Sequence, residues 1–148
     1  MILVINQLLE TDGNILITSI SKKVPLIKCV KQAVQRCYKN GRIIGGDSSE
    51  NIVGRYFVDD FWLMPPTERL NIETLLKYCR QNSIKAIIPT RDGELSFFAA
   101  HAHTLRENGI GVMISSYETV RSCLDKLLFF KVLNNLNYPA IPTVTNIN

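Results

Sequence analysis

The chain has 148 residues, of which 46% are hydrophobic and 20% are charged, and its formal net charge is +4. This length suits one domain with a substantial hydrophobic core, and the composition is ordinary for a soluble globular protein. No apolar run is long enough to span a membrane, and the N-terminal residues lack the basic start and cleavage site of a secretory signal peptide. We therefore expect a cytoplasmic protein that does not bind membranes.

The first half of the chain predicts three strands and one helix. Residues 14–19 (NILITS) are a short aliphatic and β-branched run, which is typical of a buried strand. A helix is predicted over 21–41, with an apolar stripe formed by Leu26, Ile27, Val30, Ala33, Val34 and Cys37. Residues 42–47 (RIIGGD) predict a second strand, and 55–66 (RYFVDDFWLMPP) predict a third that stops at Pro-Pro.

The second half continues the alternation. A helix is predicted over 70–83, with Asn71 as its N-cap and a stripe formed by Ile72, Leu75, Leu76 and Cys79. Residues 85–90 predict a fourth strand, 93–109 a helix, and 110–116 a fifth strand. The last segment predicts a short helix after 116, and then a second helix with Asp125 as its N-cap and a buried face of Leu127, Leu128, Phe130 and Leu133.

The cysteines, histidines and basic residues argue against two kinds of site. No CxxC pair occurs among the scattered cysteines Cys29, Cys37, Cys79 and Cys123, and His101 and His103 point to nearly opposite sides of a helix. We expect reduced thiols packed on helices and no metal site. The basic residues concentrate between 22 and 42 with a single aromatic residue, Tyr38, and no known nucleic-acid-binding motif, so we expect a solvated helix surface and no nucleic-acid interface.

Continuously apolar strands that alternate with amphipathic helices indicate a parallel sheet covered on both faces. We therefore expect an α/β fold, a Rossmann-like three-layer sandwich with a parallel sheet of about five strands. In such sheets, ligands bind outside the carboxyl ends of the strands. The polar residues that follow the predicted strands are therefore the candidates for substrate binding: Ser19, Ser21, Asp47, Arg91, Asp92 and Glu94.

Each candidate also has a purely structural interpretation. The loop around Ser19 and Ser21 contains no glycine, so the dinucleotide fingerprint GxGxxG is absent, and a capping loop with exposed lysines is an equal alternative. Asp47 is expected to begin a turn by bonding its own backbone. The acidic residues after Arg91 suit the first turn of a helix without any ligand.

Taken in order, three segments resemble the N-terminal (pre-ATP-grasp) domain of ATP-grasp ligases, in particular of proteins similar to the carbamoyl-phosphate synthase large subunit. They are NILITSISKKVPLIKCVKQA, GRIIGGDSS and KAIIPTRDGELSFFAAHAHTLRENGIGVMISSYETVRSCLDKLLFFKVLNNLNYPAIPT. The resemblance covers 14–143 and is most specific at its end, where Ser-Ser, a short helix, Asp-Lys, a helix and an x-P-x-x-P-T loop follow one another. Ser21 departs from the pattern, because glycine is common there.

The resemblance implies a ligase in which ATP phosphorylates a substrate carboxylate and an amine or another nucleophile displaces the acyl phosphate, with Mg²⁺ neutralising phosphate charge. It implies that Lys126 contacts an ATP phosphate, and that the metal-binding acids lie in two later subdomains of the same chain. The N-terminal domain would help to shape the substrate pocket. We therefore expect residues 1–148 to be an inactive fragment with no catalytic residue, no bound metal and no bound ATP.

On this interpretation 14–138 form the domain, 1–13 are an unplaced lead, and 139–148 begin a linker to the ATP-grasp subdomains. A homodimer is among the partners considered. The alternative is a free-standing Rossmann-like module that binds a nucleotide or a partner without catalysis. The two differ in whether the reading frame continues past Asn148.

Overall fold

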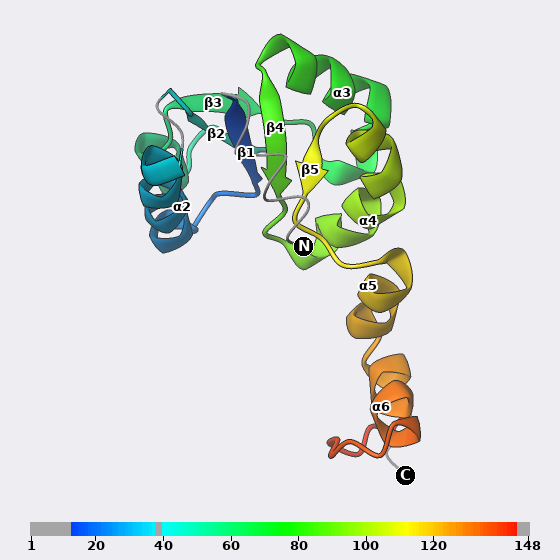
Figure 1. Ribbon diagram of the computed structural model, residues 1–148. Helices are drawn as coiled ribbons and strands as arrows, with labels where there is room; N and C mark the ends of the chain where they lie inside the picture. Colours follow the sequence, from blue (N-terminus) through cyan, green and yellow to red (C-terminus); the bar gives the residue numbers. More distant parts are fainter. Residues whose placement is uncertain (1–12, 38–39, 145–148) are drawn as a thin grey trace. The chain divides into compact units, whose positions relative to one another are not determined.

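The computed structural model describes residues 13–37 and 40–144 (Figure 1). The chain divides into two compact units, Met1–Ile114 and Ser115–Asn148. The first unit contains β1 (Asn14–Thr18), α2 (Val24–Cys37), β2 (Ile43–Asp47), the 3₁₀ helix η1 (Val53–Phe57), β3 (Asp60–Leu63), the 3₁₀ helix η2 (Thr67–Arg69), α3 (Ile72–Gln81), β4 (Ile84–Ile88), α4 (Asp92–Glu107) and β5 (Gly111–Val112). The second unit contains α5 (Tyr117–Leu124) and α6 (Lys126–Asn135). The expected lead at 1–13 lies outside the described residues except for Gly13.

The strands form one five-stranded sheet in the order β3-β2-β1-β4-β5, and every neighbouring pair is parallel. Figure 1 shows α2 on one side of this sheet and α3 and α4 on the other. This confirms the predicted α/β fold with a parallel sheet flanked by helices. The central strand β1 lies between β2 and β4, so the loops that follow these three strands meet at one edge.

Each face of the sheet has its own apolar core. Leu16, Ile44 and Ile87 pack on one face, in a cluster with side chains of α3 and α4 that include Leu75, Phe98 and Leu105. Ile17 and Ile43 pack on the other face, with Ile27 and Val34 of α2. Neighbouring residues of a strand point to opposite faces, so the continuously apolar strands supply both clusters.

Two edge strands are shorter than predicted. In the predicted strand 55–66, only Asp60–Leu63 pair with β2, and the residues before them form η1. The η1 backbone packs closely on the loop after β1, because a Cβ atom on Gly54 would lie 2.2 Å from the carbonyl oxygen of Ile20. In the predicted strand 110–116, only Gly111–Val112 pair with β4. Both strands lie at an edge of the sheet and form hydrogen bonds to one neighbouring strand only, so fewer of their residues pair.

The two N-caps that the sequence predicts are confirmed. The backbone N–H of Thr74 donates to the Asn71 side chain at 2.8 Å, so Asn71 is the N-cap of α3. The N–H groups of Leu127 and Leu128 each donate to the Asp125 carboxylate at 2.9 Å, so Asp125 is the N-cap of α6.

Two predictions about burial are wrong, and a third is confirmed only in part. On α2 the buried residues are Ile27 and Val34, whereas Ala33 and Cys37 of the predicted stripe are exposed. Among the cysteines, all of which are free thiols, Cys79 is buried but Cys29, Cys37 and Cys123 are exposed. On α6 no residue is fully buried, but the predicted face of Leu127, Leu128, Phe130 and Leu133 is half-buried. The common reason is that periodicity marks an apolar stripe, whereas burial depends on which surface the stripe meets.

Candidate ligand-binding site at the carboxyl edge of the sheet

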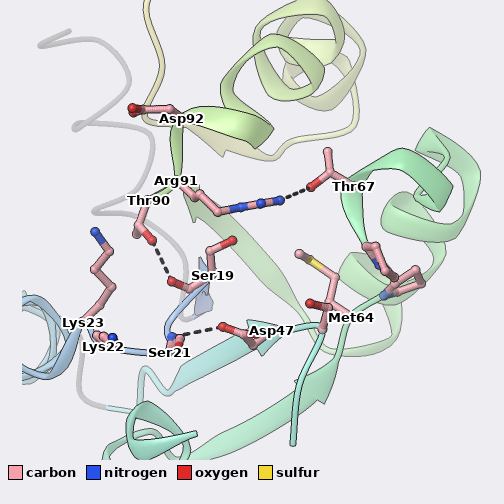
Figure 2. Close-up of a pocket in the computed structure, with 13 residues that line it drawn as sticks. Ser19, Ser21, Lys22, Lys23, Asp47, Met64, Thr67, Thr90, Arg91 and Asp92 are labelled. Carbon is pink, nitrogen blue, oxygen red and sulfur yellow. Dashed lines mark hydrogen bonds between the residues drawn. The ribbon is translucent and has the colours of Figure 1, made fainter.

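A cavity of about 490 Å³ lies at the carboxyl ends of four strands. Its walls are residues from the segments that follow β1, β2, β3 and β4, at 19–23, 47–48, 64–67 and 90–92 (Figure 2). All of them belong to the unit Met1–Ile114. The cavity therefore occupies the position that the topology of an open parallel sheet assigns to ligands.

Five of the six residues predicted for substrate binding in this unit line the cavity: Ser19, Ser21, Asp47, Arg91 and Asp92. Glu94 is not among the lining residues. The lining residues Met64 and Thr67 had not been predicted, and they come from the segment after β3. The rule that selects the ends of the other strands also selects this segment, so applying it to 64–67 would have found them.

The Glu94 carboxylate is buried, with 0% exposure, and it accepts four hydrogen bonds. Its Oε1 accepts from the Thr18 hydroxyl at 2.7 Å, from the Thr90 N–H at 2.7 Å and from the Arg91 N–H at 3.1 Å. Its Oε2 accepts from the Ser19 hydroxyl at 2.8 Å. One side chain of α4 thus joins the loop after β1 to the loop after β4.

Asp47 anchors the other side of the loop after β1. Its Oδ2 accepts from the Ser21 N–H at 3.0 Å (Figure 2). Its Oδ1 accepts from the Ser49 N–H at 3.2 Å. The second of these bonds is the turn that had been expected for this aspartate as its structural alternative. Asp47 is nearly buried, and each of its carboxylate oxygens already accepts a hydrogen bond from a backbone N–H.

Cations outnumber free carboxylates around the cavity. Lys22, Lys23 and Arg91 line it, and within the described part of the chain none of them has an acidic side chain at ion-pair distance. Arg91 donates across the cavity to the Thr67 hydroxyl at 3.3 Å (Figure 2). Of the two lining acids, Asp47 is committed to backbone N–H groups and Asp92 is exposed. Three cations thus face two carboxylates, and the lining residues carry a formal excess of one positive charge.

The perturbed titratable groups lie outside the lining residues. Burial raises the pKa of the Cys79 thiol to about 12, and it is also the first cause that raises the pKa of Tyr78 to about 12. Trp62 stacks on Tyr78 with ring centroids 3.9 Å apart. Burial alone would raise the pKa of Asp59, but the Ile43 N–H and neighbouring cations outweigh it and lower that pKa. These groups stabilise the fold and do not point to chemistry in the cavity.

Lys126 lies in the other unit, as the first residue of α6 and directly after its N-cap. Its side chain is exposed, and its ammonium group has no hydrogen-bond or ion-pair partner among the described residues. The described residues contain no group of three or more potential metal ligands of the His, Cys, Asp and Glu types. They also contain no helix that is long and apolar enough to cross a membrane.

Residues 15–113 match the family model described as "PylC-like, N-terminal domain", which covers more than half of the chain. A comparison with curated protein sequences finds no match. The match to the family model thus coincides with the sheet unit and includes every residue that lines the cavity.

Solved structures with the same fold come from larger enzymes. The N5-carboxyaminoimidazole synthetase of Staphylococcus aureus, solved with ADP, is 18% identical with a TM-score of 0.60, and the match covers 88% of this chain and 31% of that one. The biotin carboxylase domain of a single-chain bacterial carboxylase is 16% identical with a TM-score of 0.62, covering 91% and 31%. That of a thermophilic 2-oxoglutarate carboxylase bound to ADP is 17% identical with a TM-score of 0.61, covering 93% and 30%. The chain spans about a third of the length of these relatives.

Proposed function

The chain belongs to the PylC-like N-terminal domain family and is a pre-ATP-grasp domain of ATP-grasp enzymes, and from this membership we propose that it serves an ATP-dependent ligase. In the proposed reaction, ATP phosphorylates a substrate carboxylate, and an amine or another nucleophile then displaces phosphate from the acyl phosphate. The γ-phosphoryl group passes from ATP to a carboxylate oxygen and ADP is released, and the phosphate displaced in the second step carries away that oxygen. The contribution of this domain is to bind and orient the small-molecule substrate.

The observation that carries this proposal is the positively charged cavity at the carboxyl edge of the sheet. Arg91 presents a guanidinium group there without an acidic partner among the described residues, and a guanidinium binds a carboxylate or a phosphate through two parallel hydrogen bonds. Lys22 and Lys23 add to the field that attracts an anion. We assign Arg91 to the anionic group of the substrate, and the lining residues Ser21 and Asp92 to its polar groups.

For ATP and Mg²⁺ the described residues supply little. They hold no cluster of acids that fits a metal ion, so no step of the reaction is assigned to a metal on this domain. We propose that the C-terminal ATP-grasp subdomains of the same chain supply the metal ligands and most ATP contacts, and that 139–148 begin the linker to them. From this domain, Lys126 would reach an ATP phosphate. The 148 residues alone would then have no ligase activity and would bind ATP weakly or not at all.

The first experiment tests the cavity. The ¹⁵N-labelled 148-residue protein is titrated with succinate and, separately, with inorganic phosphate, which distinguishes a carboxylate site from a phosphate site. Arg91→Ala should weaken the binding of the preferred anion about tenfold or more, because a charge-assisted hydrogen-bonded pair is lost. Lys77→Ala, which removes an exposed cation on α3 away from the cavity, is the matched control and should stay within about twofold. Equal affinities for Arg91→Ala and the unmodified protein would contradict the proposed site.

The second experiment tests the role of Lys126. Isothermal titration of the 148-residue protein with ATP and Mg²⁺ should detect no micromolar binding. In the chain that carries the ATP-grasp subdomains, Lys126→Ala should raise the ATP concentration needed for half-maximal activity while the fold stays intact. An unchanged ATP requirement would leave Lys126 as a helix-start residue only.

A binding module without catalysis is the second candidate. The observation that favours it is that all the lining residues of the cavity come from Met1–Ile114, so the site is assembled without another domain. The reading frame beyond Asn148 separates the two candidates. A continuation of a couple of hundred residues with clustered acids supports the ligase, and a stop codon supports the module.

A further inference from the structure

Glu94 is the one fully buried carboxylate in the described part of the chain, and it connects segments that are more than seventy residues apart in sequence. It does not line the cavity, so it does not contact a ligand there. We propose that Glu94 is a positioning residue that holds the loops after β1 and β4 in the arrangement that forms the anion site. This inference deepens the proposed function and rests on it for the identity of the ligand, but not for the mechanical role of Glu94.

The loop after β1 needs such a support because its backbone is strained. Ser19 has φ of +52°, in the left-handed region that a residue with a side chain occupies at a cost. Glycine would adopt this conformation freely, but no glycine is present between Asn14 and Arg36. The Ser19 hydroxyl donates to Glu94 at 2.8 Å, so the residue that carries the strain is itself held by the buried carboxylate.

Thr90 provides a second connection between the same loops. Its hydroxyl donates to the carbonyl oxygen of Thr18 at 2.7 Å. The same hydroxyl lies 3.0 Å from the carbonyl oxygen of Ser19, to which it also donates (Figure 2). Its N–H donates to Glu94. The carbonyl groups on either side of the strained residue are therefore tied to the loop that begins with Thr90, and that loop is tied to Glu94.

The consequence for the cavity is that its two ligand-facing loops depend on one side chain. Glu94 fixes the N–H of Arg91, from which the guanidinium extends across the cavity to Thr67. It also fixes Ser19, two residues before Ser21, whose N–H is held from the other side by Asp47. Replacing a buried acceptor that receives four hydrogen bonds should destabilise the two loops, because each released donor is left without a partner.

The test is amide hydrogen exchange in the 148-residue protein, compared with Glu94→Gln. The amides of Thr90 and Arg91 donate directly to the carboxylate. They should therefore exchange faster in Glu94→Gln even if Glu94 holds only these two residues. The positioning role makes a further prediction: the amides of Ser21 and Lys23, which do not touch Glu94, should exchange about tenfold faster because the strained loop is released. Exchange changes confined to Thr90 and Arg91 would overturn the proposal.

Two further variants keep the test specific. Asn108→Ala removes side-chain hydrogen bonds at the opposite end of α4 and is the control for general loss of stability, so it should leave Ser21 and Lys23 protected. Ser19→Gly, added to Glu94→Gln, should restore much of the protection of Ser21, because glycine adopts the left-handed conformation without a partner. A failure of this rescue counts against the strain argument.

If Glu94→Gln does not fold, Thr90→Val removes the other connection to the carbonyl groups of Thr18 and Ser19, and the same exchange pattern is expected. Binding of succinate or phosphate is measured on the same samples. Where the unmodified protein binds one of these anions, Glu94→Gln should weaken it about tenfold. Where the unmodified protein binds neither, the proposed anion site fails, and the exchange pattern alone still decides the role of Glu94.

Discussion

The two units of the chain contain similar apolar helices, but they differ in what those helices pack against. In Met1–Ile114, side chains of α2, α3 and α4 are buried in two clusters on the faces of the sheet. In the described part of Ser115–Asn148, Val120 is the one buried residue, although six of the ten residues of α6 are apolar. An apolar stripe on a helix is therefore not enough for burial. The stripe must also meet an apolar surface, such as a face of the parallel sheet.

The exposed side chains follow the same division. Several large apolar residues of the second unit are exposed: Leu124, Phe129, Leu136, Tyr138, Ile141 and Val144. In the sheet unit the large apolar residues of the strands are mostly buried, and the cavity forms where the loops leave the sheet. Stability should therefore come mainly from the first unit, and four experiments test this difference between the two units.

The largest difference is expected in thiol reactivity. Cys123 of α5 is exposed, as are Cys29 and Cys37 of α2, whereas Cys79 of α3 is 1% exposed and its burial raises its pKa to about 12. Cys79 should react roughly a thousandfold more slowly, because the reagent reaches it only when the core opens. A chromogenic disulfide reagent should therefore count three fast thiols in the native protein and a fourth after denaturation. Four fast thiols would show that the core beside α3 is open.

The second difference concerns core substitutions. Phe98 is fully buried in the cluster between the sheet and α4, so Phe98→Ala should lower the free energy of unfolding by about 3–5 kcal/mol. Phe130 in α6 is half-buried, and Phe130→Ala should cost about 1 kcal/mol or less. Urea unfolding of both variants measures the difference. Similar losses for the two variants would mean that α6 has a core of its own.

The third experiment separates the two residues that begin α6. Asp125→Ala removes the N-cap and should reduce the stability of this helix by about 1 kcal/mol, visible as lower helical content in far-ultraviolet circular dichroism. Lys126→Ala should leave the helix intact or raise its stability by ~0.3 kcal/mol, because a cation in the first turn opposes the helix dipole. Equal losses would give Lys126 a structural role and weaken its assignment to ATP.

A small effect is also expected at the surface of the sheet unit. Burial alone would raise the pKa of Asp59, but the Ile43 N–H, Lys31 and Arg42 outweigh it, so the pKa lies below its ordinary value of 3.8. Because the pKa is lower in the folded state, the stabilisation is present above the unfolded-state pKa and is lost as the pH falls through the folded-state value. Asp59→Asn should therefore cost about 0.5 kcal/mol near neutral pH, a figure reduced for solvent screening.

The same variant should make unfolding less sensitive to pH below about 4, because the titrating group is gone. Glu50→Gln, which neutralises an exposed carboxylate of the same unit, is the control. Thermal unfolding between neutral and acidic pH measures both variants. An unchanged acid dependence in Asp59→Asn would show that the Ile43 and Lys31 contacts do not perturb Asp59 in solution.

Much of the fold could be predicted because the signals are local. The caps Asn71 and Asp125 act on backbone N–H groups two or three residues away, and the alternation of strands with helices indicates a parallel sheet. The lengths of β3 and β5 were overestimated, because both lie at edges where the pairing on one side is missing. The sequence pattern does not distinguish an edge strand from a central one.

The candidate site was predicted as a set of loops, but not as a set of roles. Arg91 and Ser21 follow strands and line the cavity, as the topology rule requires. Glu94 belongs to the same sequence motif but points inward, where it binds Thr18 and Ser19. Nothing in the order of residues 91 to 94 states which carboxylate faces the ligand and which holds the loop.

By itself, the sequence determined the order of the elements, the α/β class, two helix caps and the edge of the sheet where polar loops gather, since these depend on contacts between near neighbours and on the period of the apolar residues. The three-dimensional arrangement of the sheet unit was needed to show which side of α2 is buried and that Glu94 joins two loops. The contacts of Glu94 depend on β1 lying beside β4, which brings together residues more than seventy positions apart. The free energy of such contacts is set by burial and by hydrogen-bond geometry, and neither is encoded in a local pattern.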